Sequence, residues 1–147
     1  MTTIFNQILA TIKSDLIGTV KVGSNIYRSR FEAASRAETP FIYIEPDEAD
    51  QDNERTTAKL DWQSRVRISI GVRGQIPDEV ADPILADVHS RILNSYLSGA
   101  LKNLLIDIQP IKHKWRFSEG DQPIAVVDVY FMVMYRTNIT DLSTGVP

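Results

Sequence analysis

The chain has 147 residues and a formal net charge of −3, and 43% of its residues are hydrophobic, which is too apolar for a disordered chain. This length suits one globular domain that folds without a metal or disulfide staple. Cysteine is absent, so disulfide scaffolds, thiolate metal sites and cysteine nucleophiles are excluded. No apolar run reaches the ~20 residues of a membrane-spanning helix, and Met1 does not open a secretory signal pattern. We therefore expect an intracellular or virion protein without a membrane segment.

The first predicted element is an amphipathic helix that begins after Thr2 or Thr3, either of which can cap it, and ends at Gly18. Its apolar residues recur at spacings of three and four, which is one face of a helix. They are Ile4, Phe5, Ile8, Leu9, Ile12, Leu16 and Ile17. Residues 19–39 are expected to be irregular, with a basic patch at Arg28, Arg30 and Arg36.

A short strand is predicted at residues 41–44, because Pro40 and Pro46 flank it and proline is tolerated at strand ends. The segment 45–61 then holds seven acidic residues against two basic ones, a sum of −5, whereas the rest of the chain sums to +2. Residues 47–58 include no aromatic or branched aliphatic side chain. We expect a mobile acidic loop at about residues 46–61.

The clearest strand runs from Arg65 to Arg73, where apolar and polar residues alternate strictly. A second helix is predicted from about Asp82 to Leu97, with Asp82 as its N-cap and Pro83 at its first position. A start near Asp78 would place Pro83 inside the helix. The apolar stripe of this helix is Ile84, Leu85, Val88, Ile92, Leu93, Tyr96 and Leu97.

Strands return after Gly99, first at 104–108 and then at 111–117, where apolar and basic residues alternate. A long last strand is predicted from Pro123 to about Thr137, and we expect the tail at about 139–147 to be frayed. Together these elements predict a single α+β domain over residues 1–147, with a mainly antiparallel β-sheet flanked by two main helices.

The last strand is apolar on both faces, because Val126, Tyr130, Met132 and Met134 share the face that should be polar on a half-exposed sheet. One explanation is a helix on each side of the sheet, or a central position in a sandwich. The other is a partner subunit, since Met and Tyr are enriched at interface cores. The sequence weighs these explanations about equally.

Motifs for reactive chemistry are missing. His89 and His113 stand without metal-ligand partners at helical or strand spacing, and neither a nucleophile elbow nor a phosphate-binding glycine loop is present. The acidic segment lacks the order and the glycine of a calcium loop. We therefore predict no catalytic residue, no metal site and no cofactor. A small α+β enzyme or ligand-binding module remains an alternative, because carboxylates distant in sequence can pair in space.

Two basic stripes lie on predicted strands, one at Lys112, Lys114 and Arg116 and the other at Arg65, Arg67 and Arg73. A nucleic-acid platform is disfavoured, because alternation places Trp115 and Phe117 on the opposite face, in the core, where they cannot stack on bases. A simpler interpretation is that the stripes are ordinary solvated strand faces. A third interpretation is head-to-tail contact between copies, in which the acidic segment meets the basic stripes. The candidate interface with another subunit or partner is Arg65, Arg67, Arg73, Tyr130, Met132, Met134, Asp47, Glu48, Asp50 and Asp52.

The order of these features resembles the tail terminator (tail-completion) proteins of long-tailed bacteriophages, and the chain is similar to the lambda minor tail protein U group over nearly its full length. The features that carry the resemblance are the amphipathic first helix, the proline-flanked strand 40–44, the acidic segment, the alternating strand 65–72, the helix 81–93 and the closing strand 129–137 with its Tyr-Arg-Thr end.

The resemblance implies a structural virion protein rather than an enzyme. It would form a homo-oligomer, a hexameric ring on the head-proximal end of the tail tube. The ring stops tube polymerisation and presents the surface that the head–tail connector joins. Genome DNA would pass through the bore without sequence-specific binding. The implied partners are the tail tube protein and a connector or neck protein, with no membrane, and the implied location is the virion tail, with assembly in the host cytoplasm. Another head–tail joining (neck or stopper) protein or the tube protein itself is the nearest alternative.

Overall fold

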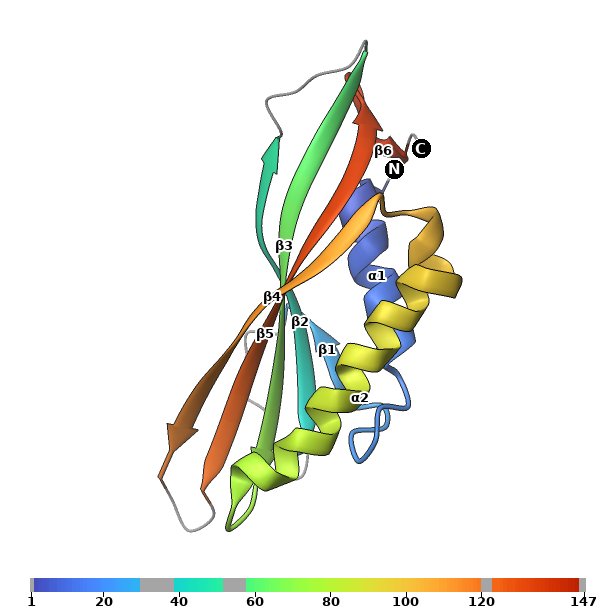
Figure 1. Ribbon diagram of the computed structural model, residues 1–147. Helices are drawn as coiled ribbons and strands as arrows, with labels where there is room; N and C mark the ends of the chain where they lie inside the picture. Colours follow the sequence, from blue (N-terminus) through green and yellow to red (C-terminus); the bar gives the residue numbers. More distant parts are fainter. Residues whose placement is uncertain (1, 30–38, 52–57, 120–122, 146–147) are drawn as a thin grey trace.

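The computed structural model describes residues 2–29, 39–51, 58–119 and 123–145 (Figure 1). In chain order the elements are α1 (Ile4–Leu16), β1 (Ile26–Arg28), β2 (Phe41–Gln51), β3 (Lys59–Arg73), α2 (Pro77–Ser98), the short 3₁₀ helix η2 (Ala100–Asn103), β4 (Asp107–Ser118), β5 (Ile124–Asn138) and β6 (Asp141–Gly145). The predicted α+β class with a mainly antiparallel sheet and two main helices is confirmed.

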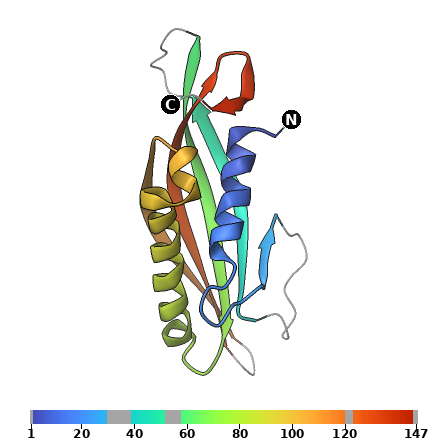
Figure 2. The same cartoon turned by 90° about the vertical axis from the view of Figure 1, so that its right-hand side faces the viewer.

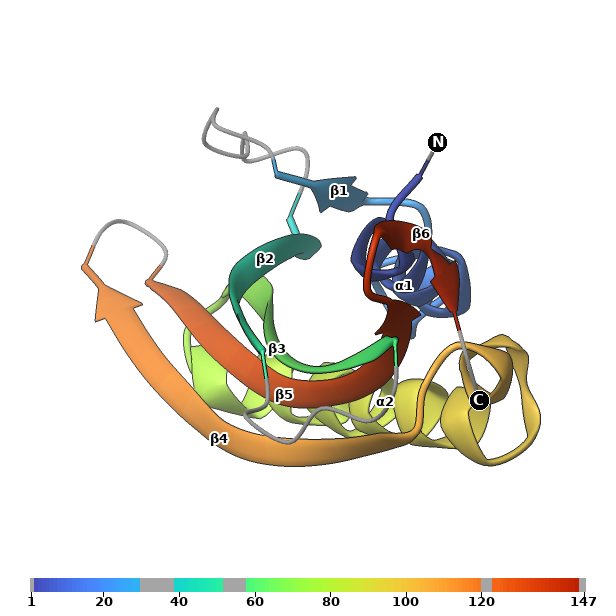
Figure 3. The same cartoon turned by 90° about the horizontal axis from the view of Figure 1, so that it is seen from above.

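The strands form one sheet in the order β1-β2-β3-β5-β4, and β6 pairs with the end of β5. Every pair of neighbouring strands is antiparallel except β1 and β2, which are parallel. Helices α1 and α2 lie side by side on the same face of the sheet (Figure 2). Seen from above, the sheet curls from β2 round to β4 (Figure 3). Its other face carries no helix of the described residues.

The core lies between this sheet and the two helices. Alternate residues of β3 and β5 point into it and are fully buried, namely Val66, Ile68, Ile70, Val72, Val127, Val129, Phe131 and Val133. The strict alternation in the sequence predicted this dry face, and the prediction is confirmed for both strands. Burial of these side chains is the main favourable term for folding, at roughly 1.5–3 kcal/mol each.

Helix α1 forms as its periodicity predicts. The Thr3 hydroxyl accepts a hydrogen bond from the Asn6 N–H and caps the first turn, and Gly18 leaves the helix at φ +92°. The segment that follows is not wholly irregular, because Ile26–Arg28 adds β1 beside β2. Arg28 donates to the Asn6 side chain at 3.1 Å. Arg30 and Arg36 of the predicted basic patch lie outside the described residues.

The predicted start of the second helix at Asp82 is wrong, because α2 begins at Pro77 and holds Pro83 in its interior. Pro77 occupies the first turn, where no backbone N–H is needed, and Asp78 and Glu79 follow at the favourable end of the helix dipole. The earlier start lets the helix bury Pro77 and Ala81, and this burial outweighs the backbone hydrogen bond that is missing at Pro83. Leu97 was predicted on the apolar stripe but is 66% exposed.

The predicted mobile loop at 46–61 is also wrong over most of its length. β2 continues to Gln51 and β3 starts at Lys59, so strand covers 46–51 and 59–61. A register shift between Pro46 and Glu48 accommodates the proline. Asp52 and its neighbours to residue 57 lie outside the described residues. Local composition failed here because the basic partners of the acidic strand lie about twenty residues further along the chain.

Strand β4 begins at Asp107 rather than 104, and of its two predicted core aromatic residues Trp115 packs against the core whereas Phe117 does not. Trp115 is half-buried, whereas Phe117, which stacks on it at 6.1 Å, is 64% exposed. The reason is that β4 is an edge strand, where Phe117 lies at the far end from η2.

The predicted frayed tail is wrong up to residue 145, since Asp141–Gly145 forms β6 against Thr137 and Asn138. The Asp141 carboxylate accepts hydrogen bonds from Ser143 and Thr144 and fixes the turn.

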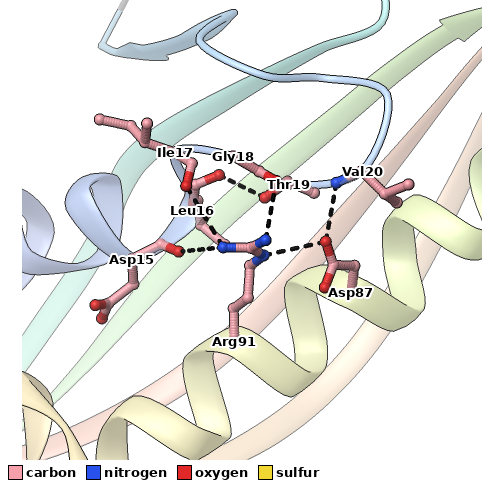
Figure 4. Close-up of polar contacts among 8 residues, drawn as sticks. All are labelled: Asp15, Leu16, Ile17, Gly18, Thr19, Val20, Asp87 and Arg91. Carbon is pink, nitrogen blue, oxygen red and sulfur yellow. Dashed lines mark hydrogen bonds and ion pairs between the residues drawn. The ribbon is translucent and has the colours of Figure 1, made fainter.

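A polar cluster joins the two helices. Arg91 of α2 donates to the carbonyl oxygens that end α1, at 2.9 Å to Gly18 and 3.4 Å to both Ile17 and Asp15 (Figure 4). Arg91 also pairs with Asp87 at 3.0 Å, and Asp87 accepts the Val20 N–H at 2.9 Å. One guanidinium thus satisfies carbonyl groups that the end of a helix leaves without partners.

We expect Arg91→Ala to lower the free energy of unfolding by about 1–3 kcal/mol, because it strands these carbonyl groups and Asp87. Urea denaturation measures the change. Asn94→Ala, on the exposed side of the same helix, is the matched control and should stay within about 0.5 kcal/mol of the parent. Equal stability of the Arg91→Ala and Asn94→Ala variants would contradict the role given to Arg91.

Candidate interaction face

The face of the sheet away from the helices, here called the open face, gathers nearly all predicted interface residues. The strand registers place its side chains in cross-strand rows, read in the order β2, β3, β5, β4. From the C-terminal end of β2 toward its start the rows are Asp50–Gln63–Met134–Asp107, Glu48–Arg65–Met132–Gln109, Glu45–Arg67–Tyr130–Lys112, Tyr43–Ser69–Asp128–Lys114 and Phe41–Gly71–Val126–Arg116.

Acidic residues of β2 pair with arginines of β3 within the chain. Arg67 donates to Glu45 at 2.6 Å, and this hydrogen bond raises the pKa of Arg67 further above its ordinary value. Arg65 lies 3.7 Å from both Asp47 and Glu48. Two of the predicted acidic contacts, together with the neighbouring Glu45, therefore already face two of the predicted basic ones within the chain, which is why the acidic segment is held as a strand.

Tyr130 sits at the centre of the open face between two cations. The Arg65 guanidinium lies 5.9 Å from the ring centroid and the Lys112 ammonium 5.0 Å. Both distances are within the range of cation–π attraction. Tyr130 is thereby fixed as a half-buried aromatic platform shared by β3, β5 and β4.

A buried carboxylate lies one row below. Asp128 is 3% exposed, accepts the Ser69 hydroxyl at 2.6 Å and binds Arg116 through both oxygens at 3.1 and 3.2 Å. Around it the open face is hollowed to about 400 Å³, lined by Phe41, Tyr43, Glu45, Arg67, Ser69, Lys114, Arg116, Val126, Asp128 and Tyr130. Asp128 was not singled out in the sequence, where an acid on an apolar strand gave no signal of its partners.

The apolar side chains of this face have no helix above them among the described residues. Met132 and Met134 are half-buried only by their neighbours in the sheet. Of the two explanations for the doubly apolar last strand, a helix on each side is absent from the described part of the chain. A partner subunit remains a prediction.

Charge separates between the two outer strands of the open face. Glu45, Glu48 and Asp50 lie on β2, whereas Lys112, Lys114 and Arg116 lie on β4. Of these cations only Arg116 has an ion pair among the described residues. Arg73, at the lower end of β3, also has a buried Nε that makes no hydrogen bond to the described residues. The β4 cations were noted as a basic stripe, but their place on an edge depends on strand order.

Acid should unfold this protein as its paired carboxylates protonate. A hydrogen bond from Arg136, at 2.5 Å, lowers the pKa of Asp61, and the Val20 N–H followed by Arg91 lowers that of Asp87. Their ordinary pKa is 3.8, so these groups stabilise the fold above that pH, and the contribution is lost as pH falls through their lower folded pKa. Burial raises the pKa of Asp15, which opposes the trend.

We therefore expect the urea midpoint to be nearly flat from pH 7 to about 5 and to fall steadily below about 4. In Asp61→Asn the acid-induced fall should be shallower and stability at pH 7 lower. If the urea midpoint of Asp61→Asn fell with acid as steeply as that of the parent, the ion pair with Arg136 would contribute nothing to the pH dependence of stability.

Among the described residues, no three His, Asp or Glu side chains come together as metal ligands. His89 is an exposed residue of α2 whose ring centroid lies 6.3 Å from that of Phe131, and His113 is exposed on β4. None of the described helices has the length and apolar character needed to cross a membrane.

No protein-family model matches the chain, and a search of curated proteins gives no match. Among solved structures the chain is similar to one from the virion of a native gene transfer agent (GTA) particle, with a TM-score of 0.49 and 12% sequence identity over 92% of each chain. Neither value identifies a family.

Proposed function

We propose that this protein is a structural component of a phage-like virion that works as a ring, most specifically a tail terminator that caps the head-proximal end of the tail tube. The observation that carries this proposal is the open face, whose Tyr130, Met132 and Met134 lie between an acidic outer strand and a basic one. A surface of this kind is suited to burial between copies of one chain. The predicted resemblance to tail terminators supplies the specific role.

The mechanism is capping by shape. One end of the ring would match the last ring of tube subunits, and the other end would receive the neck instead of another tube ring. No reacting group is required, and the proposal assigns none. Asp47, Glu48, Asp50, Arg65, Arg67, Arg73, Tyr130, Met132 and Met134 are proposed as contacts to neighbouring copies or to the tube, either directly or by shaping the open face.

Negative-stain images of the purified protein, alone and with tail tubes that lack their terminator, test this function. The proposal expects discrete rings alone and one ring at a single end of each tube. Extended tubes would assign the protein to the tube instead, and rings that bind only connector complexes would assign it to the neck. A protein that stays monomeric and binds neither tubes nor connectors would refute the ring proposal altogether.

A further inference from the structure

We infer that successive copies join edge to edge, with the basic strand β4 of one copy adding to the acidic half of β2 in the next, so that the sheets become one continuous barrel wall. The inference rests on the proposed ring and specifies how it closes. The partner is a second copy of this chain.

Both joining edges are available among the described residues. β4 pairs only with β5, which leaves its other side open over Asp107–Ser118. β1 covers the outer side of β2 only at residues 42–44, with Arg28 opposite Ile44 as its last pair. No described residue pairs with the outer side of β2 at residues 45–50. Unpaired strand edges are ready templates for another strand.

The directions of the two strands fit such a joint. Three successive antiparallel pairings connect β2 to β4, so the two outer strands run in opposite directions. Rotation about the ring axis preserves the sense in which each strand runs along that axis. β4 of one copy therefore meets β2 of the next as an antiparallel pair, in a head-to-tail contact that repeats.

Charge selects this pairing over the symmetric ones. Contact between two β4 edges would bring Lys112, Lys114 and Arg116 together, and contact between two β2 edges would bring acidic residues together, both of which are unfavourable. Lysines on an edge strand ordinarily guard it against pairing. Here the β4 lysines disfavour pairing with a second β4 edge and favour pairing with the acidic edge of β2.

The charges also select a register. If the rows of two copies were level, Lys112 would face Glu45, but Asp107 would face Asp50, a like-charge pair. A shift of two rows places Lys112 opposite Asp50, Lys114 opposite Glu48 and Arg116 opposite Glu45. All three pairs then have opposite charges on the open face, and they use only the part of β2 that β1 leaves uncovered.

The same shift suits a closed barrel. It displaces the ladder by four residues for every four strands, or one residue per strand. This is the ratio of an eight-stranded barrel with a shear of eight, whose strands tilt by about 36°. A level register would leave the strands parallel to the barrel axis, whereas the strands of closed barrels are tilted. On the other side of the joint, Trp115 and the exposed Phe117 would gain contacts beside Pro46.

Because the chain has no cysteine, disulfide trapping tests this joint directly. A chain with Lys112→Cys and Asp50→Cys should, on mild oxidation, give a ladder of covalent multimers on non-reducing gels, since opposite residues lie within disulfide reach. The control with Lys112→Cys and Glu45→Cys places the thiols about 13 Å apart across the joint and should stay uncrosslinked.

Crosslinking of the first pair alone supports the joint. Rings that are visible by electron microscopy but crosslink only through the control pair, or through neither, would overturn the joint and leave the proposed function standing. Absence of both self-association and tube binding would refute the joint and the proposed function together. Thermal unfolding of each reduced variant confirms that the comparison is made on folded protein.

Discussion

Two charge-reversed variants that cannot self-associate alone should assemble when mixed. The first variant is Lys112→Glu with Lys114→Glu on β4, and the second is Glu48→Lys with Asp50→Lys on β2. Each alone places like charges across every joint, which we expect to cost about 2 kcal/mol per joint, or about 30-fold in the dissociation constant, at moderate salt. In a mixture, each reversed edge meets its complement in the other variant.

Sedimentation velocity on the single variants and on an equimolar mixture measures this effect. The mixture should recover the parent's assembly with equal amounts of the two chains, because they must alternate. Lys13→Glu with Lys102→Glu makes the same charge change away from both edges and should leave assembly unchanged. Failure of the mixture to assemble any better than the single variants would contradict the charge-matched joint.

The two faces of β5 should respond differently to alanine. Phe131 is fully buried beneath α2, and we expect Phe131→Ala to lower the free energy of unfolding by about 3–5 kcal/mol through the cavity it leaves. Met132 is the next residue and lies on the open face. We expect Met132→Ala to cost the monomer about 1 kcal/mol or less but to weaken self-association clearly.

Urea denaturation at low protein concentration and sedimentation at high concentration separate the two effects. Met132→Val is a milder control for the open face, since it keeps an apolar side chain there. If Met132→Ala destabilised the monomer as much as Phe131→Ala, the open face would be part of the core. If it changed neither quantity, the open face would have no role in assembly.

Local alternation predicted β3 and β5 because a period of two needs no knowledge of neighbouring strands. The extension of β2 through Glu45, Glu48 and Asp50 could not be predicted locally, since it depends on cross-strand Arg65 and Arg67. Strand order decided two further features. It made β4 an edge and exposed Phe117 instead of burying it, and it placed Asp128 beside Ser69 and Arg116. Sequence spacing alone contains neither relation.

Which residues share the open face could therefore be predicted in part from the sequence, whereas their role as an interface stays a prediction. Tyr130, Met132 and Met134 were predicted from a doubly apolar strand, and the structure places them together on the open face. Arg65 and Arg67 were expected to meet acidic residues, and they meet those of their own chain. The unbalanced cations Lys112 and Lys114 emerged only when the order of the strands was known.

Hydrogen–deuterium exchange of dilute and assembled protein tests the edge-to-edge joint most directly, because new strand pairing protects backbone amides. The account predicts that assembly slows exchange in peptides covering β4 at 112–117 and β2 at 45–50, while peptides of α1 and α2 stay unchanged. Assembly that slows exchange on the helices and leaves both strand edges unprotected would contradict it.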